Sequence, residues 1–233
     1  MIIDIHMHFA HDIETKKIVE AARNAGIDKL CFLPLSRRGE ALKYSYTSEE
    51  VKQIMDQHPE VVGFHPGSVT DPEGIEDLER SVKKYGFRGM KIHQEKNWRL
   101  EGLLACHALF RKAGELKIPV VIHPSTPIID AELARSCPET TFIFAHAGYQ
   151  WEEAFQAAKP YENACFDTSG YDAVAGVVER GVELLGAERI FFGSDAPVRN
   201  FASQLAKVQY ADISKRDKRL ILGENAARVL NLR

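Results

Sequence analysis

Residues 119–146 contain two short apolar runs, Pro119-Val120-Val121-Ile122-His123 and Thr141-Phe142-Ile143-Phe144-Ala145-His146, and each run ends in a histidine. Runs of this length that are rich in β-branched and aromatic residues are typical of buried strands. The segment between the two runs, from Asp130 to Arg135, has the spacing of apolar residues expected of a helix. A strand, a helix and a second strand in this order form the unit from which parallel α/β folds are built.

The same unit recurs along the whole chain. The predicted strands are Ile2 to His6, Leu30 to Leu33, Val61 to His65, Phe87 to His93, Pro119 to His123, Thr141 to His146, Ala164 to Asp167 and Arg189 to Asp195. The predicted helices are Glu14 to Ala25, Ser48 to Gln57, Ile75 to Lys84, Leu100 to Leu116, Asp130 to Arg135, Glu152 to Ala158, Ala173 to Leu185 and a final helical region from Phe201 to Leu230. Strict alternation around eight strands predicts an α/β fold, a closed (β/α)₈ TIM barrel, with residues 1–233 as a single domain. A doubly wound open sheet is the alternative, and the lack of a glycine-rich phosphate loop after the first run disfavours it.

Residues typical of helix ends flank several of these segments. Thr47-Ser48-Glu49-Glu50 and Asp71-Pro72-Glu73 combine capping residues with acids and predict helix starts. Gly26, Gly86 and Gly186 lie where helices are expected to end.

The composition is that of an ordinary globular protein, with 45% hydrophobic and 27% charged residues. A formal net charge of −3 provides no general attraction to nucleic acid or to an anionic membrane. No apolar run is long enough to span a bilayer, and no basic stretch precedes an apolar core at the N-terminus. We therefore expect a cytoplasmic protein with a small-molecule substrate and no nucleic-acid or membrane partner. The oligomeric state is left open, with a homodimer as one alternative.

The histidines are concentrated at one kind of position. Of the nine in the chain, six lie in or just beyond the last residue or two of a predicted strand: His6, His8, His65, His93, His123 and His146. Chance would place about one histidine there, and functional groups of such barrels lie at these strand ends. The sequence therefore predicts a site built from imidazoles.

Three of these histidines and one aspartate have the character of a metal site. His6 and His8 are two residues apart on the first strand, so both side chains leave the same face and can bind one cation. His123 ends the fifth strand and Asp195 ends the eighth. Three nitrogens, one oxygen and a remaining open position describe a catalytic site for one divalent metal ion. Zinc is the first expectation, with manganese, iron and cobalt as alternatives.

His146, at the end of the sixth strand, has three possible roles. It is a fourth nitrogen ligand, a general acid or base, or a packed histidine bonded to a carbonyl. We favour the general acid or base, because the metal already has enough ligands and proton transfer near pH 7 needs a group of this pKa.

These motifs together resemble a known family. They are Asp4-Ile5-His6-Met7-His8, Ile122-His123-Pro124, Ala145-His146-Ala147-Gly148, Phe192-Gly193-Ser194-Asp195-Ala196-Pro197 and Ile221-Leu222-Gly223-Glu224-Asn225-Ala226-Ala227-Arg228. The chain is similar to the amidohydrolase superfamily, in the amidohydrolase-related (amidohydrolase 2) branch that includes aminocarboxymuconate semialdehyde decarboxylase and related lactonases. The resemblance implies that His6, His8 and His123 bind the metal. It also implies that Asp195 is a further ligand that can shuttle a proton, and that His146 polarises the substrate or assists proton transfer.

The fourth strand departs from part of that superfamily, in which a carboxylated lysine or a glutamate bridges two metals. Here Gly89, Lys91 and His93 share one face. We expect Lys91 to remain an ammonium that binds a substrate carboxylate, with His93 in support. The alternative is a carboxylated Lys91, which would allow a second metal. His65, on the third strand, is read equally well as a substrate contact or as a packing residue.

The leading functional hypothesis is a metal-dependent hydrolase that opens an ester, lactone or amide bond of a small carboxylated substrate through a metal-activated water. Nonoxidative decarboxylation of an aromatic or unsaturated carboxylic acid is the main alternative, because the same residues support both reactions. Phosphodiester cleavage is disfavoured by Lys91 and by the net charge. A non-catalytic barrel that binds a metal or ligand is a further alternative, for which a broken set of ligands would be expected.

Overall fold

The computed structural model describes residues 1–35, 42–68, 74–93, 107–148, 150–170 and 175–232. Eight parallel strands lie side by side in chain order. They are β1 (Ile3–Met7), β2 (Lys29–Phe32), β3 (Val61–Gly67), β4 (Gly89–Ile92), β5 (Val120–Ile122), β6 (Phe142–Phe144), β7 (Ala164–Asp167) and β8 (Ile190–Phe191). All eight predicted strands are confirmed.

Hydrogen bonds between the first and last strands close the sheet. The Ile5 amide donates to the Phe192 carbonyl at 2.9 Å, and the His8 amide donates to the Ala196 carbonyl at 2.7 Å. The segment that follows β8 is therefore hydrogen-bonded to β1, and the sheet has no free edge between its first and last strands. The predicted TIM barrel is confirmed, and the open-sheet alternative is wrong.

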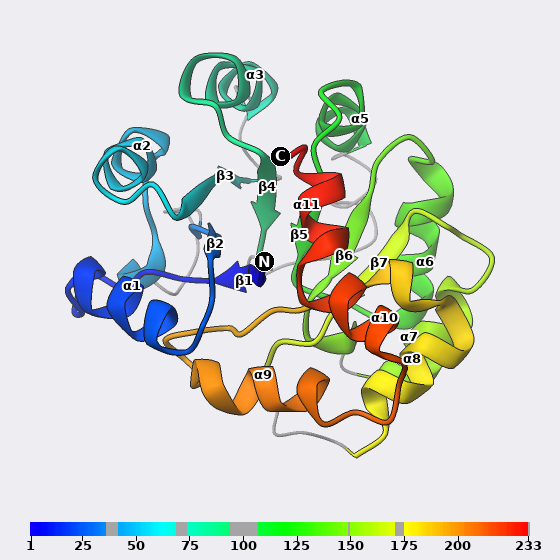
Figure 1. The fold of residues 1–233 in the computed structure, drawn as a ribbon. Helices are drawn as coiled ribbons and strands as arrows, with labels where there is room; N and C mark the ends of the chain where they lie inside the picture. The colour runs from blue at the N-terminus through cyan, green and yellow to red at the C-terminus, as the bar shows by residue number, and fades with distance from the viewer. Residues whose placement is uncertain (36–41, 69–73, 94–106, 149, 171–174, 233) are drawn as a thin grey trace.

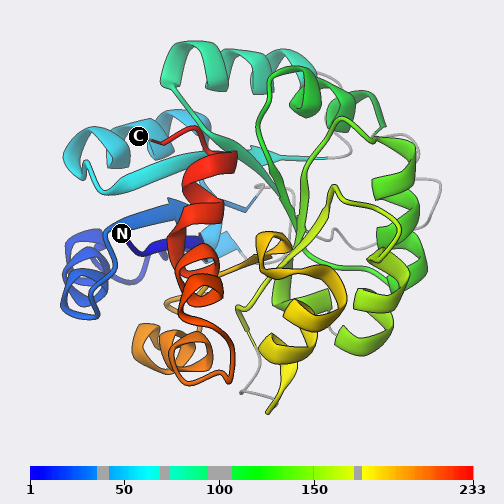
Figure 2. The ribbon, with the colours of Figure 1, turned by 45° about the vertical axis from the view of Figure 1, so that its right-hand side comes forward.

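Helices surround the barrel (Figures 1 and 2). The main helices are α1 (Thr15–Asn24), α2 (Ser48–Gln57), α3 (Gly74–Tyr85), α5 (His107–Glu115), α6 (Pro127–Ser136), α7 (Trp151–Ala158), α8 (Val177–Leu185), α9 (Phe201–Gln209), α10 (Lys215–Arg219) and α11 (Asn225–Val229). Short turns of other helical types are η1 (Leu42–Tyr44), η2 (Ala145–Gly148), η3 (Ala187–Arg189) and η4 (Leu220–Glu224). The prediction of one helical region from Phe201 to Leu230 is wrong, because the chain leaves the helix after Gln209 and the Ser214 hydroxyl, accepting from the Asp217 amide, begins a new one.

Several predicted helix ends are confirmed. Thr47 and Glu50 form a complete capping box at the start of α2. Gly26, Gly86 and Gly186 have φ values of 84°, 76° and 85°, the left-handed geometry in which helices commonly end. The predicted start at 71–73 and the first residues of the predicted helices from Leu100 and Ala173 lie outside the described residues.

Two apolar clusters lie on opposite faces of the sheet. The larger joins outward strand residues such as Phe32 and Val120 to the surrounding helices. The smaller contains the alternate strand residues, among them Phe64 and Val121, together with Ala226 and Leu230 from the C-terminal segment. It therefore fills the barrel interior, and the C-terminal segment packs against it where the strands begin. In Figure 1, α11 passes in front of the barrel near both chain ends, so the opposite end is the one open for chemistry.

The first strand contains an irregularity just before its histidines. Asp4 pairs with Leu30, but Met7 pairs with Phe32, so β1 advances by one more residue than β2. This extra residue is a bulge, which turns neighbouring side chains to the same face. Ile3 and Ile5 consequently belong to the interior cluster. Strict alternation along β1 would turn Ile3 and Ile5 away from the face of His6 and His8, and the bulge breaks that alternation.

Cys31, Cys137 and Cys165 are buried and free, and Cys106 lies outside the described residues. In the described part of the chain, no helix has both the length and the apolar character needed to cross a membrane.

Asp130 in α6 provides a test of this packing. Its side chain is only 3% exposed, and burial raises its pKa from 3.8 to about 7. Protonation therefore favours the folded state, and this contribution is lost as the pH rises from about 4 to about 7. We expect Asp130→Asn to be more stable than the parent at pH 8, by up to about 4 kcal/mol, with the difference vanishing near pH 4.

Urea unfolding at the two pH values measures this difference, and Asp212→Asn at an exposed site is the control. Equal stability of Asp130→Asn and the parent at pH 8 would contradict the assignment.

Candidate active site

A cavity of about 240 Å³ opens at the carboxyl ends of the strands. Seven of the predicted site residues line it: His6, His8, Lys91, His93, His123, His146 and Asp195. Five different strands or strand ends thus deliver side chains to one place, which is the geometry that parallel barrels use for active sites.

Within the cavity, three side chains form a compact group. The Nε2 atoms of His6 and His8 lie 3.3 Å apart, and Asp195 Oδ1 lies 3.8 Å and 3.5 Å from them. For ligands about 2.0–2.1 Å from a tetrahedral ion, neighbouring ligand atoms are about 3.3 Å apart. His6, His8 and Asp195 therefore have nearly the spacing that a single divalent metal ion requires.

Hydrogen bonds at Nδ1 fix the orientation of the His6 and His8 rings, so that both Nε2 atoms point towards Asp195. His6 Nδ1 lies 2.7 Å from Asp167 Oδ2, and His8 Nδ1 lies 2.6 Å from the Leu33 carbonyl oxygen. Since both partners are acceptors, each Nδ1 carries the proton and each Nε2 presents a lone pair. Burial, followed by the charge of Lys91, lowers the pKa of His6 to about 3, so this ring is neutral and ready to bind a cation.

The two acidic residues around this group remain ionised. Burial alone would raise the pKa of Asp167, but the interactions with His6 outweigh it and hold the pKa below its usual range. Burial likewise works against ionisation of Asp195, and the adjacent rings of His8 and His6 lower its pKa. Each carboxylate is therefore charged at neutral pH and balances the positive groups of the cavity.

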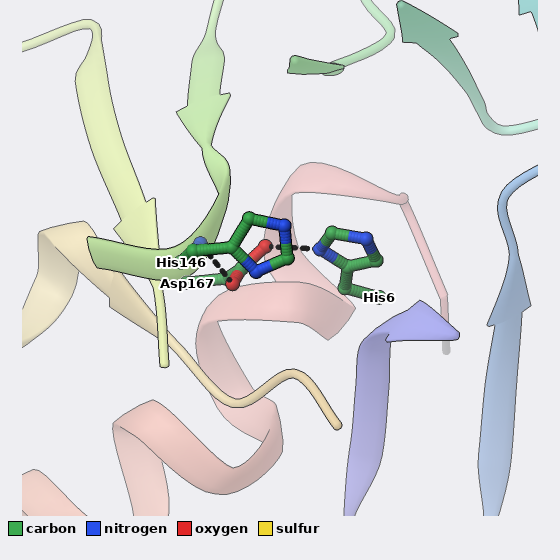
Figure 3. A group of neighbouring side chains, drawn as sticks. All are labelled: His6, His146 and Asp167. Carbon is green, nitrogen blue, oxygen red and sulfur yellow. Dashed lines mark hydrogen bonds and ion pairs between the residues drawn. The ribbon is translucent and has the colours of Figure 1, made fainter. Parts of the chain in front are cut away.

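His146 lies beside this group in a tightly fixed position. Its ring centroid is 5.1 Å from that of His6 and 5.2 Å from that of His123. Its backbone has φ of 56°, and its amide donates to Asp167 Oδ1 at 3.1 Å. Figure 3 shows Asp167 joining His6 and His146. Burial lowers the pKa of His146, so the ring is neutral and can accept a proton.

His123 lines the cavity but is not part of the three-residue group. Its ring centroid lies 4.5 Å from that of His93. Burial, with the charges of Lys91 and His93, lowers the pKa of His123. The structure thus brings two of the three predicted nitrogen ligands together with Asp195 and leaves His123 further across the cavity.

Lys91 extends from β4 to the centre of the site. Its side chain is 1% exposed, and Nζ lies 3.4 Å from His6 Nε2. Burial lowers its pKa to about 8, with Asp167 and Asp195 acting in the opposite direction. The lysine is therefore still mostly protonated at pH 7 and provides a positive charge in the cavity.

His65 does not reach the cavity. Its Nδ1 lies 3.0 Å from Ser81 Oγ in α3 and 3.4 Å from Ser48 Oγ in α2. On β3, Phe64 occupies the inward position, where a Cβ on Gly89 would come within 2.1 Å of the Phe64 ring. His65 therefore points outward to the helices. These contacts agree with the packing alternative, and His65 is not among the described residues that line the cavity.

The sequence did not single out every residue of the site. Asp167 ends a predicted strand, and its carboxylate accepts from the Ser169 amide. Its bond to His6 joins residues 161 positions apart, for which the sequence carries no local signal. Arg199, Val198 and Leu35 also line the cavity. Tyr44, the last residue of η1, lines it too.

The family of the chain follows from its sequence match. The model of a family described as Amidohydrolase matches residues 3–232. The chain belongs to the amidohydrolase family. No curated protein matches this amidohydrolase.

Solved structures with the same fold include several family members. A 2,6-dihydroxybenzoate decarboxylase from Rhizobium has 18% identity and a TM-score of 0.74, over 95% of this chain and 89% of its own. A dihydroxybenzoic acid decarboxylase from Polaromonas with bound manganese and 2-nitroresorcinol has 17% identity and a TM-score of 0.72, over 95% and 86%. An amidohydrolase from Burkholderia multivorans with bound zinc has 12% identity and a TM-score of 0.82, with both chains covered fully at 100%. At these identities the likeness shows the shared barrel.

Gly170, next to His146, generates a testable prediction. A Cβ at Gly170 would lie 2.4 Å from His146 Nδ1, whereas a Cβ at Gly176 would have no atom within 4 Å. Both glycines have positive φ, 81° and 88° respectively. Both Gly→Ala changes therefore carry backbone strain, but only Gly170→Ala adds a clash with the site.

We expect Gly170→Ala to lower the free energy of unfolding by about 1–3 kcal/mol more than Gly176→Ala, measured by denaturant titration. Equal destabilisation by the two variants would show that His146 has room to move.

Proposed function

We propose that this amidohydrolase is a metal-dependent enzyme that hydrolyses an ester, lactone or amide bond in a small carboxylated substrate. The observation that carries the proposal is the group formed by His6, His8 and Asp195, whose ligand atoms lie 3.3–3.8 Å apart. The two rings are held by Nδ1 hydrogen bonds in the tautomer that a metal needs.

One divalent ion fits these residues. Two neutral imidazole nitrogens and one carboxylate oxygen suit zinc, and they also suit manganese, iron or cobalt. The zinc in the Burkholderia amidohydrolase and the manganese in the Polaromonas decarboxylase support this choice. His123 is proposed as a further ligand from across the same cavity. When bound, the ion supplies Lewis acidity and lowers the pKa of a water molecule.

The residues of the chain supply the remaining steps. Asp195 accepts a proton from the attacking water, because its carboxylate is ionised and faces the cavity. Asp195 then returns this proton to the leaving group, so that no net proton is gained or lost. His146 binds the carbonyl oxygen or relays the same proton from its position beside His6. Lys91 and His93 bind a negatively charged part of the substrate near the reacting atoms.

Lys91 is proposed to act as an ammonium. Its Nζ already lies 3.4 Å from His6 Nε2, and Asp167 and Asp195 favour its charged form. A second metal would require carboxylation of this lysine, which native mass spectrometry at neutral pH detects as the added mass of one CO₂.

Nonoxidative decarboxylation is the second candidate. The structural neighbours named above include two decarboxylases of dihydroxybenzoic acids. In that reaction the same cavity would bind the substrate oxygens, and a protonated group of the cavity would deliver a proton to carbon. A screen of lactones, amides and aromatic carboxylic acids with CO₂ detection separates the two reactions, because only decarboxylation releases CO₂.

Removal of the paired histidines tests the metal site. We expect the purified protein to contain about one divalent ion per chain and the double variant His6→Ala/His8→Ala to lose it, since two of the ligands are gone. Elemental analysis by mass spectrometry measures the content, and His58→Ala at the end of α2 is the control. Full retention of the ion by the double variant would overturn the ligand assignment.

A change at His146 tests the proton-transfer role. We expect His146→Asn to keep its metal but to lower turnover of the compound found in the screen by about 10²–10⁴-fold. Steady-state kinetics with parallel metal analysis gives both quantities. Unchanged turnover would remove His146 from the chemistry.

A further inference from the structure

The rim of the cavity carries a guanidinium group without a partner in the described structure. Arg199 lines the cavity from the segment that follows β8, and its amide donates to the Asp195 carbonyl at 3.1 Å. This turn places Arg199 four residues beyond Asp195 and fixes its backbone. Among the described residues, no hydrogen bond or ion pair engages the Arg199 side chain, whereas Arg180 and Arg216 on outer helices are paired with glutamates.

The charges of the cavity favour an anion beside Arg199. The rings of His6, His123 and His146 are neutral, and Asp195 is the one carboxylate among the described lining residues. In the proposed function Asp195 is occupied by the divalent ion. A guanidinium at the rim is then left to bind a negative group of the substrate, and its planar fork matches a carboxylate with two hydrogen bonds.

The neighbours of Arg199 restrict the rest of the ligand. Val198 is 46% exposed, and it lines the cavity together with Leu35 and Tyr44. Apolar and aromatic walls of this kind favour a hydrocarbon or unsaturated body between two polar ends. Lys91 cannot bind the ligand group that Arg199 binds, because the Lys91 Nζ is buried beside His6 and not at the rim.

We infer that Arg199 is a specificity-determining residue that binds a carboxylate of the substrate, at the end of the substrate remote from the reacting group. The substrate is then a dicarboxylate, or a monocarboxylate whose reactive bond lies at the opposite end of the molecule. This inference rests on the proposed function for the identity of the site. It assigns the remote end of the substrate to the cavity rim, whichever of hydrolysis or decarboxylation takes place at the metal ligands.

Binding of matched probes tests the inference without turnover. Isothermal titration calorimetry on the full-length, zinc-loaded protein would compare aliphatic dicarboxylates from succinate to pimelate with the monocarboxylate of the same chain length. We expect at least one dicarboxylate to bind more tightly than its monocarboxylate, because its second carboxylate reaches Arg199. Arg199→Gln should weaken that dicarboxylate by about five- to tenfold and leave the monocarboxylate unchanged.

Two further variants give the experiment its controls. Arg199→Lys retains the charge but not the two parallel N–H donors of the guanidinium, and it should recover part of the dicarboxylate affinity. Arg216→Gln, which removes an exposed arginine of α10, should leave the affinity for both probes unchanged. The inference is overturned if no dicarboxylate is preferred by the parent, or if Arg199→Gln retains the preference. Metal content and turnover are measured on the same preparations, so a failure of the proposed function is seen separately from a failure of the rim site.

Discussion

The site depends on one buried hydrogen bond, which His6 Nδ1 donates to Asp167 Oδ2 over 2.7 Å. This bond joins β1 to β7, which only β8 separates, and places the proton of His6 on the side away from the cavity. As a result, His6 Nε2 presents its lone pair towards His8 Nε2 and Asp195 Oδ1. The same carboxylate accepts from the His146 amide, so one aspartate holds both the His6 ring and the backbone of His146. A neutral partner in its place would leave the His6 tautomer free to change.

The closure of the barrel provides the second constraint. Residues 194 and 195 donate their amides to the His6 carbonyl, so the strand that carries the two histidines also holds the segment that carries Asp195. The bulge between Asp4 and Met7 lets His6 face the cavity immediately after Ile5 has packed in the interior. Asp4, at the start of the bulge, accepts hydrogen bonds from the Ser194 amide and from the Ser194 hydroxyl. Fold and site are therefore coupled through the same few backbone contacts, and the segment beyond Asp195 brings Arg199 to the rim.

Much of this was readable from the sequence, for a physical reason. Buried parallel strands require apolar runs, and the carboxyl ends of eight such strands must meet, so histidines ending separate runs could be assigned to one cavity. The direction in which a side chain points at a strand end could not be predicted from these apolar runs. The direction of His65 depends on Phe64 filling the space beside Gly89, and the facing of Ile5 depends on a one-residue register shift. The bond from His6 to Asp167 and the placement of Arg199 depend on contacts between distant segments, for which local periodicity carries no information.

X-ray absorption spectroscopy of the zinc-loaded protein tests the central claim most directly, because it reports the atoms bound to the ion. The account predicts a first coordination shell of nitrogen and oxygen at about 2.0–2.1 Å, with the outer scattering of at least two imidazole rings. Asp167→Asn should weaken zinc binding by about 10–100-fold while the parent spectrum shows those rings. A shell containing sulfur at about 2.3 Å, or one of oxygen without imidazole scattering, would contradict the assignment of His6 and His8.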